Sequence, residues 1–186
     1  MSDATSDPLI GKIIGEKYKI LTRIGVGGMG GVYKAQHLLI DRIVAIKVLR
    51  NAQTEDDTQL KRFHQEARTA SQLSHPNAVT LFDFGVESGA PYLVMEYING
   101  RTLKEVLAAE GPLPVARTRE ILRQVCAGLR EAHNLGIIHR DLKPDNVMFR
   151  VADDGAEIAK VLDFGIAKST LPSADDGLTM PGMLVG

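Results

Sequence analysis

The pattern of apolar residues changes near residue 100, and this change limits the folds open to the 186-residue chain. Before Tyr97, short apolar runs alternate with turn-forming residues, as they do in a sheet. After Asn99-Gly100 the apolar residues recur at helical spacing, most clearly over residues 117–135. The sequence therefore predicts an α+β fold of two lobes, with one buried face on the long helix. That face is expected to contain Ile121, Leu122, Val125, Cys126, Leu129 and Ala132.

The predicted organisation has three parts. Residues 1–17 are expected to form a flexible lead, residues 18–98 a first lobe, and residues 99–186 a second lobe. The first lobe is predicted to hold five strands and one helix, at residues 18–24, 32–35, 43–49, 60–73 (the helix), 79–82 and 92–95. The second lobe is predicted to hold helices and two short strands, at residues 103–107, 117–135, 147–150 and 159–162.

Composition and charge exclude several classes of partner. A net charge of -1 gives no reason to expect nucleic acid or an anionic membrane surface. The single cysteine, Cys126, excludes an internal disulfide framework and fits a reducing compartment. Residues 1–8 lack the basic start and apolar run of a signal peptide, and no apolar stretch reaches membrane-spanning length. We therefore expect a cytoplasmic location and no membrane segment in this chain.

The segment from His139 to Asn146 combines an acid, a base and an amide between two apolar runs. Asp141 can accept a proton from a hydroxyl, Lys143 can hold the charge of a phosphate, and the side-chain oxygen of Asn146 can ligate a divalent metal. A charged surface turn is the alternative, because such clusters are common in turns. The rest of the chain has to decide between the two.

A glycine run lies between two of the predicted strands. It fits G-x-G-x-x-G at Gly25, Gly27 and Gly30, which lets backbone N–H groups approach phosphates. A dinucleotide-binding turn would need a helix after the glycines, whereas residues 32–35 have the pattern of a strand. The G-x-x-x-x-G-K-[ST] pattern of a P-loop is absent from the sequence.

Two further positions carry charge in apolar surroundings. Lys47 ends an apolar strand, Val44-Ala45-Ile46-Lys47, where a lysine needs either a partner or solvent at a sheet edge. Glu66, on the predicted helix, is a candidate partner. Asp163 begins Asp163-Phe164-Gly165 at the end of a strand and can reach a metal, although the tripeptide alone carries little information.

Together these motifs are specific. G-x-G-x-x-G-x-V, V-A-I-K, H-R-D-L-K-P-x-N and D-F-G occur in that order in the expected strand, turn and loop contexts, and the sequence resembles the protein kinases. The Lys-Pro pair is similar to that of the Ser/Thr class. The Gly-Gly-Met-Gly turn and Leu9-Ile10-Gly11-Lys12 resemble the eukaryotic-like Ser/Thr kinases of bacteria. The resemblance, which extends from about Tyr18, implies a protein-kinase-like two-lobe fold: a five-stranded antiparallel first lobe with one main helix, and an incomplete, mainly helical second lobe.

The resemblance also implies roles for residues, with ATP and Mg²⁺ (or Mn²⁺) as cofactors. Lys47, paired with Glu66, would bind the α- and β-phosphates. Asp141 would orient the acceptor hydroxyl, Lys143 would steady the γ-phosphate, and Asn146 and Asp163 would hold the metal. Val32, Ala45 and Met148 would enclose the adenine, Met95 would be the gatekeeper, and the backbone of Glu96 and Ile98 would bind the adenine edge. The implied nucleotide-binding set is Ile24, Gly25, Val26, Gly27, Gly28, Met29, Gly30, Gly31, Val32, Ala45, Lys47, Met95, Glu96, Ile98 and Met148.

Regulation is implied by the residue before the catalytic aspartate. Arg140 resembles the arginine of kinases that are switched on by phosphorylation of the activation loop, where it pairs with the phosphate. Residues 169–185 would be that loop, and Thr179 is the favoured autophosphorylation site among its four hydroxyl side chains. An unmodified loop threonine is the alternative.

The chain stops at Gly186, before the A-P-E-like segment and the helices with which family members continue. We therefore expect a catalytic domain truncated within the activation loop, with an apolar patch exposed. The predicted function is transfer of the γ-phosphate of ATP to protein Ser/Thr hydroxyls, with protein substrates as partners and a kinase dimer as a candidate assembly. The alternatives are an inactive or pseudokinase-like nucleotide-binding module and a small-molecule phosphotransferase of related fold.

Overall fold

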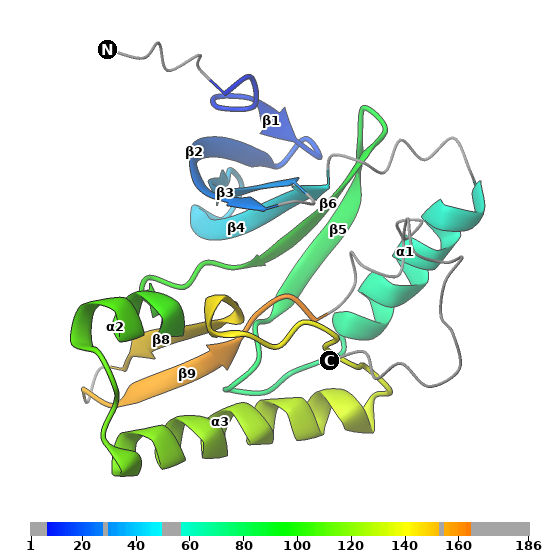
Figure 1. Cartoon of the computed structure of the whole chain (residues 1–186). Helices are drawn as coiled ribbons and strands as arrows, with labels where there is room; N and C mark the ends of the chain where they lie inside the picture. The colour runs from blue at the N-terminus through cyan, green and yellow to red at the C-terminus, as the bar shows by residue number, and fades with distance from the viewer. Residues whose placement is uncertain (1–6, 28–29, 50–56, 153–154, 165–186) are drawn as a thin grey trace, which may run out of the picture.

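The computed structural model describes residues 7–27, 30–49, 57–152 and 155–164. Figure 1 shows a curled sheet at one end of the molecule, a helix beside it, and two helices with a small sheet at the other end. The sheet contains β1 (Ile13–Ile14), β2 (Tyr18–Gly27), β3 (Gly30–His37), β4 (Arg42–Leu49), β5 (Leu81–Glu87) and β6 (Ala90–Glu96). Its strand order is β1-β2-β3-β4-β6-β5 and every pairing is antiparallel. The predicted antiparallel first lobe is confirmed.

The sheet has one strand more than the five expected, and this strand lies in the predicted flexible lead. β1 pairs with β2, and its Ile14 is only 3% exposed. The backbone N–H of Gly11 donates to Ile20, and the N–H of Ile20 donates to Lys12. The expectation of a flexible lead up to residue 17 is therefore wrong for the described residues 7–17, because backbone pairing and an apolar anchor fix them to the sheet.

Helix α1 (Asp57–Ala70) packs beside the sheet through an apolar stripe. Phe63, Ala67 and Ala70 recur at spacings of four and three residues and are all buried. Phe63 also meets Phe84 of β5 edge to face, with ring centroids 6.1 Å apart. The helix begins and ends three residues earlier than the predicted range of 60–73, and the buried Leu73 lies just beyond its end.

The second lobe places two helices around a small sheet. It contains β7 (Arg101–Thr102), α2 (Leu103–Glu110), α3 (Val115–Asn134), the 3-10 turn η1 (Pro144–Asn146), β8 (Val147–Val151) and β9 (Glu157–Val161). Helix α2 begins at a capping box, in which the Thr102 hydroxyl accepts from the Glu105 N–H and the Glu105 carboxylate accepts from the Thr102 N–H. Strands β7, β8 and β9 form an antiparallel sheet, and α3 runs along it (Figure 1).

The buried face of α3 differs from the predicted one. Leu122 is 56% exposed and Cys126 is exposed, whereas Gln124 and Gly128 are buried. The side-chain oxygen of Gln124 accepts from the N–H of Ala159 at 2.8 Å, so hydrogen bonding to β9 turns a polar residue inward. The expected burial of Leu122 and Cys126 is therefore wrong.

One apolar core joins the two lobes. It includes Phe63 of α1, Met95 of β6, Val125 of α3 and Val161 of β9, while a second cluster around Tyr33 lies within the first lobe. In the part of the chain that the structure describes, none of the helices combines the length and apolarity needed to span a membrane.

Candidate active site

The catalytic loop is held from within by a buried histidine. His139 is 4% exposed, and its Nε2 lies 2.6 Å from the carbonyl oxygen of Leu162. Its Nδ1 accepts from the N–H of Asp141 at 3.3 Å, which leaves Nε2 as the nitrogen that donates to Leu162. The ring also meets Phe164 edge to face at 5.3 Å. One side chain therefore fixes the loop to the segment that carries Asp163.

Asp141, Lys143 and Asn146 converge, as predicted. Lys143 Nζ lies 2.9 Å from Asp141 Oδ2, and Asn146 Nδ2 donates to the Asp141 carbonyl oxygen at 2.8 Å and to its Oδ2 at 3.3 Å. The hydrogen bond that Lys143 donates to Asp141, and then the charge of that carboxylate, raise the pKa of Lys143 above its usual value. Pro144 begins the turn η1, which orients Asn146, and Asn146 is 7% exposed. Because its amide nitrogen is used on Asp141, its oxygen is the atom available to ligate a cation.

The lysine of β4 meets the aspartate that lies after β9. Lys47 Nζ lies 2.7 Å from Asp163 Oδ2, although the two residues are far apart in sequence. The Lys47 side chain is 15% exposed and the Asp163 side chain 36%, so the pair lies at a partly open site. Asp163 has a φ of 54°, a left-handed conformation that is uncommon outside glycine and often marks functional sites.

Arg140 and Glu66 line the same cavity, which Phe164, the residue after Asp163, also lines. The cavity has a volume of about 320 Å³, and its lining includes Arg62 and Glu66 of α1 together with Arg140 and Phe164. Arg140 also has a left-handed φ, 59°. The geometry places Glu66 and Arg140 near one another, and the pairing of Glu66 with Lys47 stays a prediction.

The predicted adenine residues lie on neighbouring strands. Ala45 of β4 is directly opposite Met95 of β6, and both are buried, as is Ile98. Val32 and Met148 are half-buried. The N–H of Glu96 donates to the Thr80 carbonyl oxygen at 3.0 Å, and the contact of the Glu96 and Ile98 backbone with an adenine edge stays a prediction.

The glycine run forms the turn between β2 and β3. Gly25 pairs with Val32, and Gly27 pairs with Gly30. Ile24 and Val26 are 47% and 77% exposed, while Gly31 is buried. Gly28, Met29 and the predicted regulatory Thr179 lie outside the described residues.

Asp163 and Asn146, the two predicted oxygen ligands, suit a metal ion whose remaining ligands include phosphate oxygens. In residues 7–164, apart from the short gaps in the description, no three His, Cys, Asp or Glu side chains form a cluster able to hold a metal. Asp163 supplies a carboxylate and Asn146 an amide oxygen, which are hard ligands. Magnesium is commonly held by one or two carboxylates together with substrate phosphates and water. The residues present therefore fit a cation that arrives with a nucleotide.

Sequence reasoning missed a second buried lysine. Lys160 of β9 is 7% exposed; its Nζ lies 2.7 Å from Glu96 Oε1 and donates to the Ala78 carbonyl oxygen at 3.2 Å. Glu96 Oε1 also accepts from the Thr80 N–H at 2.8 Å. This cluster ties the segment between the lobes to the strand that leads to Asp163. The available signal was the one used for Lys47, a lysine inside an apolar strand.

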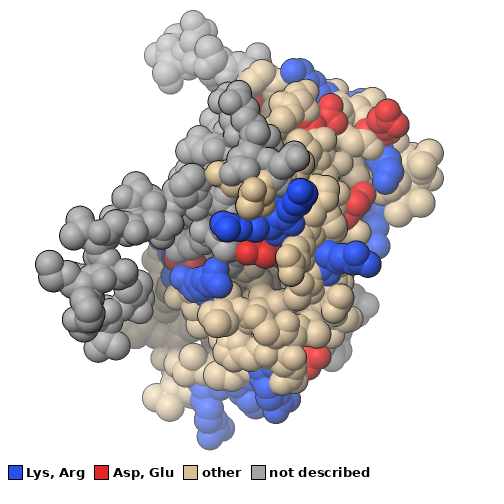
Figure 2. All heavy atoms as spheres, turned by 90° about the vertical axis from the view of Figure 1, so that its right-hand side faces the viewer, with Lys and Arg blue, Asp and Glu red and all other residues tan. Residues whose placement is uncertain are grey.

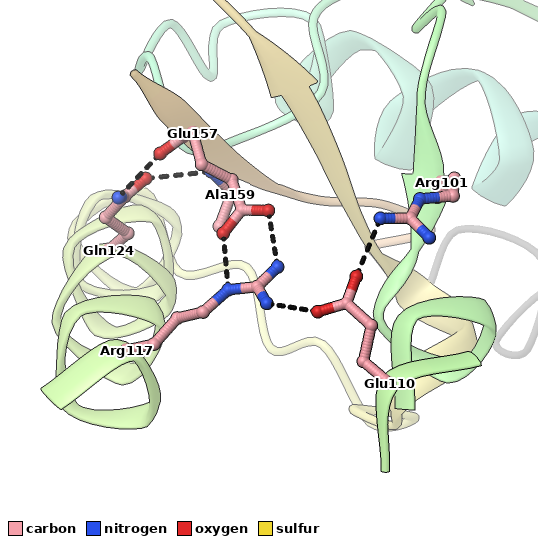
Figure 3. Close-up of polar contacts among 6 residues, drawn as sticks. All are labelled: Arg101, Glu110, Arg117, Gln124, Glu157 and Ala159. Atoms are coloured by element: carbon pink, nitrogen blue, oxygen red, sulfur yellow. Dashed lines mark hydrogen bonds and ion pairs between the residues drawn. The ribbon is translucent and has the colours of Figure 1, made fainter. Parts of the chain in front are cut away.

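A polar network connects helices and strands of the second lobe (Figure 3). Arg117 of α3 binds Glu157 of β9 through two nitrogens, at 3.0 and 2.8 Å, and binds Glu110 of α2 at 2.5 Å. Glu110 also accepts from Arg101. The hydrogen bonds that Arg117 donates to Glu157 and then to Glu110 raise the pKa of Arg117 above its usual range. The network joins α2, α3 and β9, and the loop that carries Asp141 follows α3 in the chain. On the side of the molecule that carries α1, basic and acidic side chains are interspersed (Figure 2).

The order of these parts defines the fold as that of the protein kinases: a glycine turn between β2 and β3, a lysine on β4, a catalytic loop before β8 and an aspartate after β9. The comparison with known sequences agrees. The chain belongs to the protein kinase domain family, whose pattern matches residues 18–180.

Similar proteins include bacterial Ser/Thr kinases. The chain is 44% identical over 189 residues to the serine/threonine-protein kinase pkn3 of Myxococcus xanthus, with 100% of the chain and 34% of that protein covered. It is 45% identical over 159 residues to PrkC of Bacillus subtilis, with 86% and 24% covered. The chain thus spans about a third or less of these relatives.

Solved structures agree with the fold. The crystal structure of the Mycobacterium tuberculosis PknI kinase domain matches with a TM-score of 0.74 and 32% identity, over 85% of this chain and 63% of that one. Rad53 1-466 in complex with AMP-PNP matches with a TM-score of 0.71 and 31% identity, over 81% and 38%. The bacterial Ser/Thr kinase resemblance is confirmed.

Proposed function

We propose that this chain carries the nucleotide site and catalytic loop of an ATP-dependent Ser/Thr protein kinase that acts on protein substrates in the cytoplasm. The observation that carries the proposal is the meeting of Lys47 with Asp163, at 2.7 Å, beside the Asp141–Lys143–Asn146 cluster. In this proposal Lys47 is the cation for phosphate oxygens, and Asp163 is the anion for a metal. The relatives named as Ser/Thr kinases support the assignment.

The residues act mainly by positioning and by charge. Lys47 would turn from Asp163 to the α- and β-phosphates, freeing the Asp163 carboxylate to ligate Mg²⁺ together with the Asn146 oxygen. The metal, when bound, neutralises charge on the phosphates. Asp141, oriented by Asn146, would accept the proton of a Ser or Thr hydroxyl. Lys143 would hold its charge against the transferring group, because its pKa is raised by Asp141.

The test compares the chain with two variants for transfer of labelled γ-phosphate from ATP to a basic acceptor protein. Asp141→Asn should keep Mg²⁺-dependent nucleotide binding and lose several powers of ten in transfer, on the order of 4 kcal/mol or more. Asp163→Ala should lose both Mg²⁺-dependent binding and transfer. Normal transfer by Asp141→Asn would refute the role given to that residue.

The same experiment separates the competing function. Mg²⁺-dependent nucleotide binding by the unaltered chain, without any transfer, would indicate a nucleotide-binding module. The presence of Lys47, Asp141 and Asp163 favours the kinase.

Regulation and assembly belong to the same proposal. We propose Thr179 as the autophosphorylated residue and Arg140 as the partner of its phosphate. Mass spectrometry of active protein that found phosphate only on other hydroxyls would contradict the choice of Thr179. A kinase dimer stays a prediction, which sedimentation of the protein would check.

A further inference from the structure

We infer that Asp7, ahead of the first strand, positions the glycine turn and thereby sets nucleotide affinity. The inference rests on the proposed nucleotide site, and it concerns a residue in the segment that sequence reasoning took for a flexible lead. The described chain begins at Asp7, six residues before β1. The Asp7 side chain is only 8% exposed, which is unusual for a carboxylate so close to a chain end.

Asp7 contacts both strands that form the turn. Its Oδ2 accepts from the Tyr33 hydroxyl of β3 at 2.9 Å and lies 3.2 Å from Arg23 Nη1 of β2. Its Oδ1 accepts from the N–H of Leu9 at 3.1 Å, which fixes the carboxylate to its own segment. Both oxygens are therefore used, and one of them joins β2 to β3 through side chains.

The contacted residues are directly opposite one another at the root of the turn. Arg23 pairs with Tyr33, and the next pairs toward the turn are Gly25 with Val32 and Gly27 with Gly30. A register shift between Arg23 and Gly25 marks an irregularity beside the contact. Such irregularities bend a strand and redirect the residues beyond the bend, so a fixed side-chain pair at this point controls the direction of the turn.

The Tyr33 ring connects the Asp7 hydrogen bond to the backbone of the glycine run. Tyr33 is fully buried, and a Cβ added to Gly31 would lie 2.7 Å from its ring and its hydroxyl oxygen. The backbone at Gly31 therefore lies against the ring whose hydroxyl Asp7 holds. A change in the tilt of that ring would shift Gly31, which belongs to the predicted phosphate-binding run.

Arg23 depends on the same carboxylate. Among the described residues, its Nε is buried without a hydrogen-bond partner, and its guanidinium also lies over the Tyr33 ring, 6.0 Å from the centroid. Without Asp7, a partly buried cation would lose its counter-ion beside the turn. The Arg23 side chain would then turn toward solvent, and β2 would shift with it.

The experiment measures hydrogen exchange of residues 24–32 without nucleotide, and the dissociation constant of Mg²⁺–AMP-PNP. The variants are Asp7→Ala, Tyr33→Phe and the double variant. Glu16→Gln is the control, because Glu16 is an exposed acid of the same segment. We expect Asp7→Ala to raise exchange in the turn about tenfold, with little change in α3. Nucleotide binding should weaken about fivefold, equivalent to about 1 kcal/mol.

The double variant should behave like Asp7→Ala alone, because the Tyr33–Asp7 hydrogen bond that Tyr33→Phe removes is one of the contacts that Asp7→Ala already removes. Tyr33→Phe keeps the ring in place and decides the matter if Asp7→Ala does not fold. Unchanged turn exchange in both variants, or a change equal to that of Glu16→Gln, would overturn the inference. Exchange that rises uniformly through the protein would show a purely structural contact and would also overturn it. Absence of nucleotide binding by the unaltered chain would instead refute the proposed function, while the exchange data still decide the role of Asp7.

Discussion

Gly30, the last glycine of the G-x-G-x-x-G pattern, should be required by the sheet itself, whether or not a nucleotide binds. It has a φ of 147°, a conformation essentially reserved for glycine. A Cβ at this position would lie 1.8 Å from the carbonyl oxygen of Val48 on β4. Because that oxygen belongs to the backbone of a paired strand, it cannot rotate away as a side chain would. Gly30→Ala must therefore displace either β3 or β4.

The expected loss of stability is large for one methyl group. Backbone strain of this kind costs about 1–3 kcal/mol, and overpacking costs about 1–3 kcal/mol more. We expect the free energy of unfolding to fall by about 4 kcal/mol. For a chain of this length, each 1 kcal/mol lowers Tm by about 2–4 °C, so Tm should fall by about 8–16 °C.

Gly25→Ala is the matched control in the same turn. A Cβ there would lie 3.6 Å from Val32 Cβ, an ordinary contact, and Gly25 has no positive φ. Its Tm should stay within about 2 °C, because alanine also restricts the unfolded chain. Nucleotide affinity should still fall, since the methyl group occupies the proposed phosphate face. Thermal unfolding followed by circular dichroism, with and without Mg²⁺–AMP-PNP, measures both effects. Equal Tm values for the two variants would refute the reasoning.

Buried, capped and exposed groups each lead to one further prediction. Lys160→Met should lower the free energy of unfolding by about 2–4 kcal/mol in urea titrations, because it strands the carboxylate of Glu96, and adding Glu96→Gln should recover most of the loss. Hydrogen bonds from Thr102 lower the pKa of Glu105, so its support of α2 is complete above pH 4.5 and is lost as pH falls through the lower folded pKa. A carboxyl titration by NMR should show this midpoint rising in Thr102→Ala, and an unchanged midpoint would contradict the capping box. Cys126 should react with a maleimide in the folded chain as completely as in urea, and protection would contradict its exposed position.

The parts of the site that are contiguous in sequence could be predicted. Asp141, Lys143 and Asn146 lie within six residues, so a single turn brings their side chains together whatever the rest of the fold does. The meeting of Lys47 with Asp163 is different. It depends on the packing of two lobes. The order of the motifs assigned both residues to one nucleotide site, but the ion pair predicted for Lys47 was with Glu66.

The parts that were mispredicted depend on tertiary partners. β1 has two residues, too few for a periodic pattern, and it exists because β2 offers an edge. On α3, the apolar pattern predicted that Leu122 and Cys126 are buried. Gln124 is buried instead, because its side-chain oxygen accepts a hydrogen bond from the N–H of Ala159 on the neighbouring strand. Helical periodicity identifies a face to within about one residue, and a specific hydrogen bond then sets the rotation.

Lys47 and Lys160 show that a lysine inside an apolar strand marks a charged site in the sequence but does not identify the role of that site. Lys47 and Lys160 each lie inside an apolar strand, and each has a carboxylate at 2.7 Å. Lys160 also donates to the Ala78 carbonyl oxygen, and its partner Glu96 is bound by the Thr80 N–H as well, so this pair is locked within the protein. The partner of Lys47 is 36% exposed and sits in a left-handed backbone conformation beside the catalytic loop. The Lys160–Glu96 pair, bound on all sides by the protein, supports the joint between the lobes. The Lys47–Asp163 pair is partly exposed, so Lys47 can exchange the carboxylate for a phosphate and Asp163 can exchange the lysine for a metal. The surroundings of the carboxylate, rather than the lysine, therefore distinguish the structural position from the proposed catalytic one.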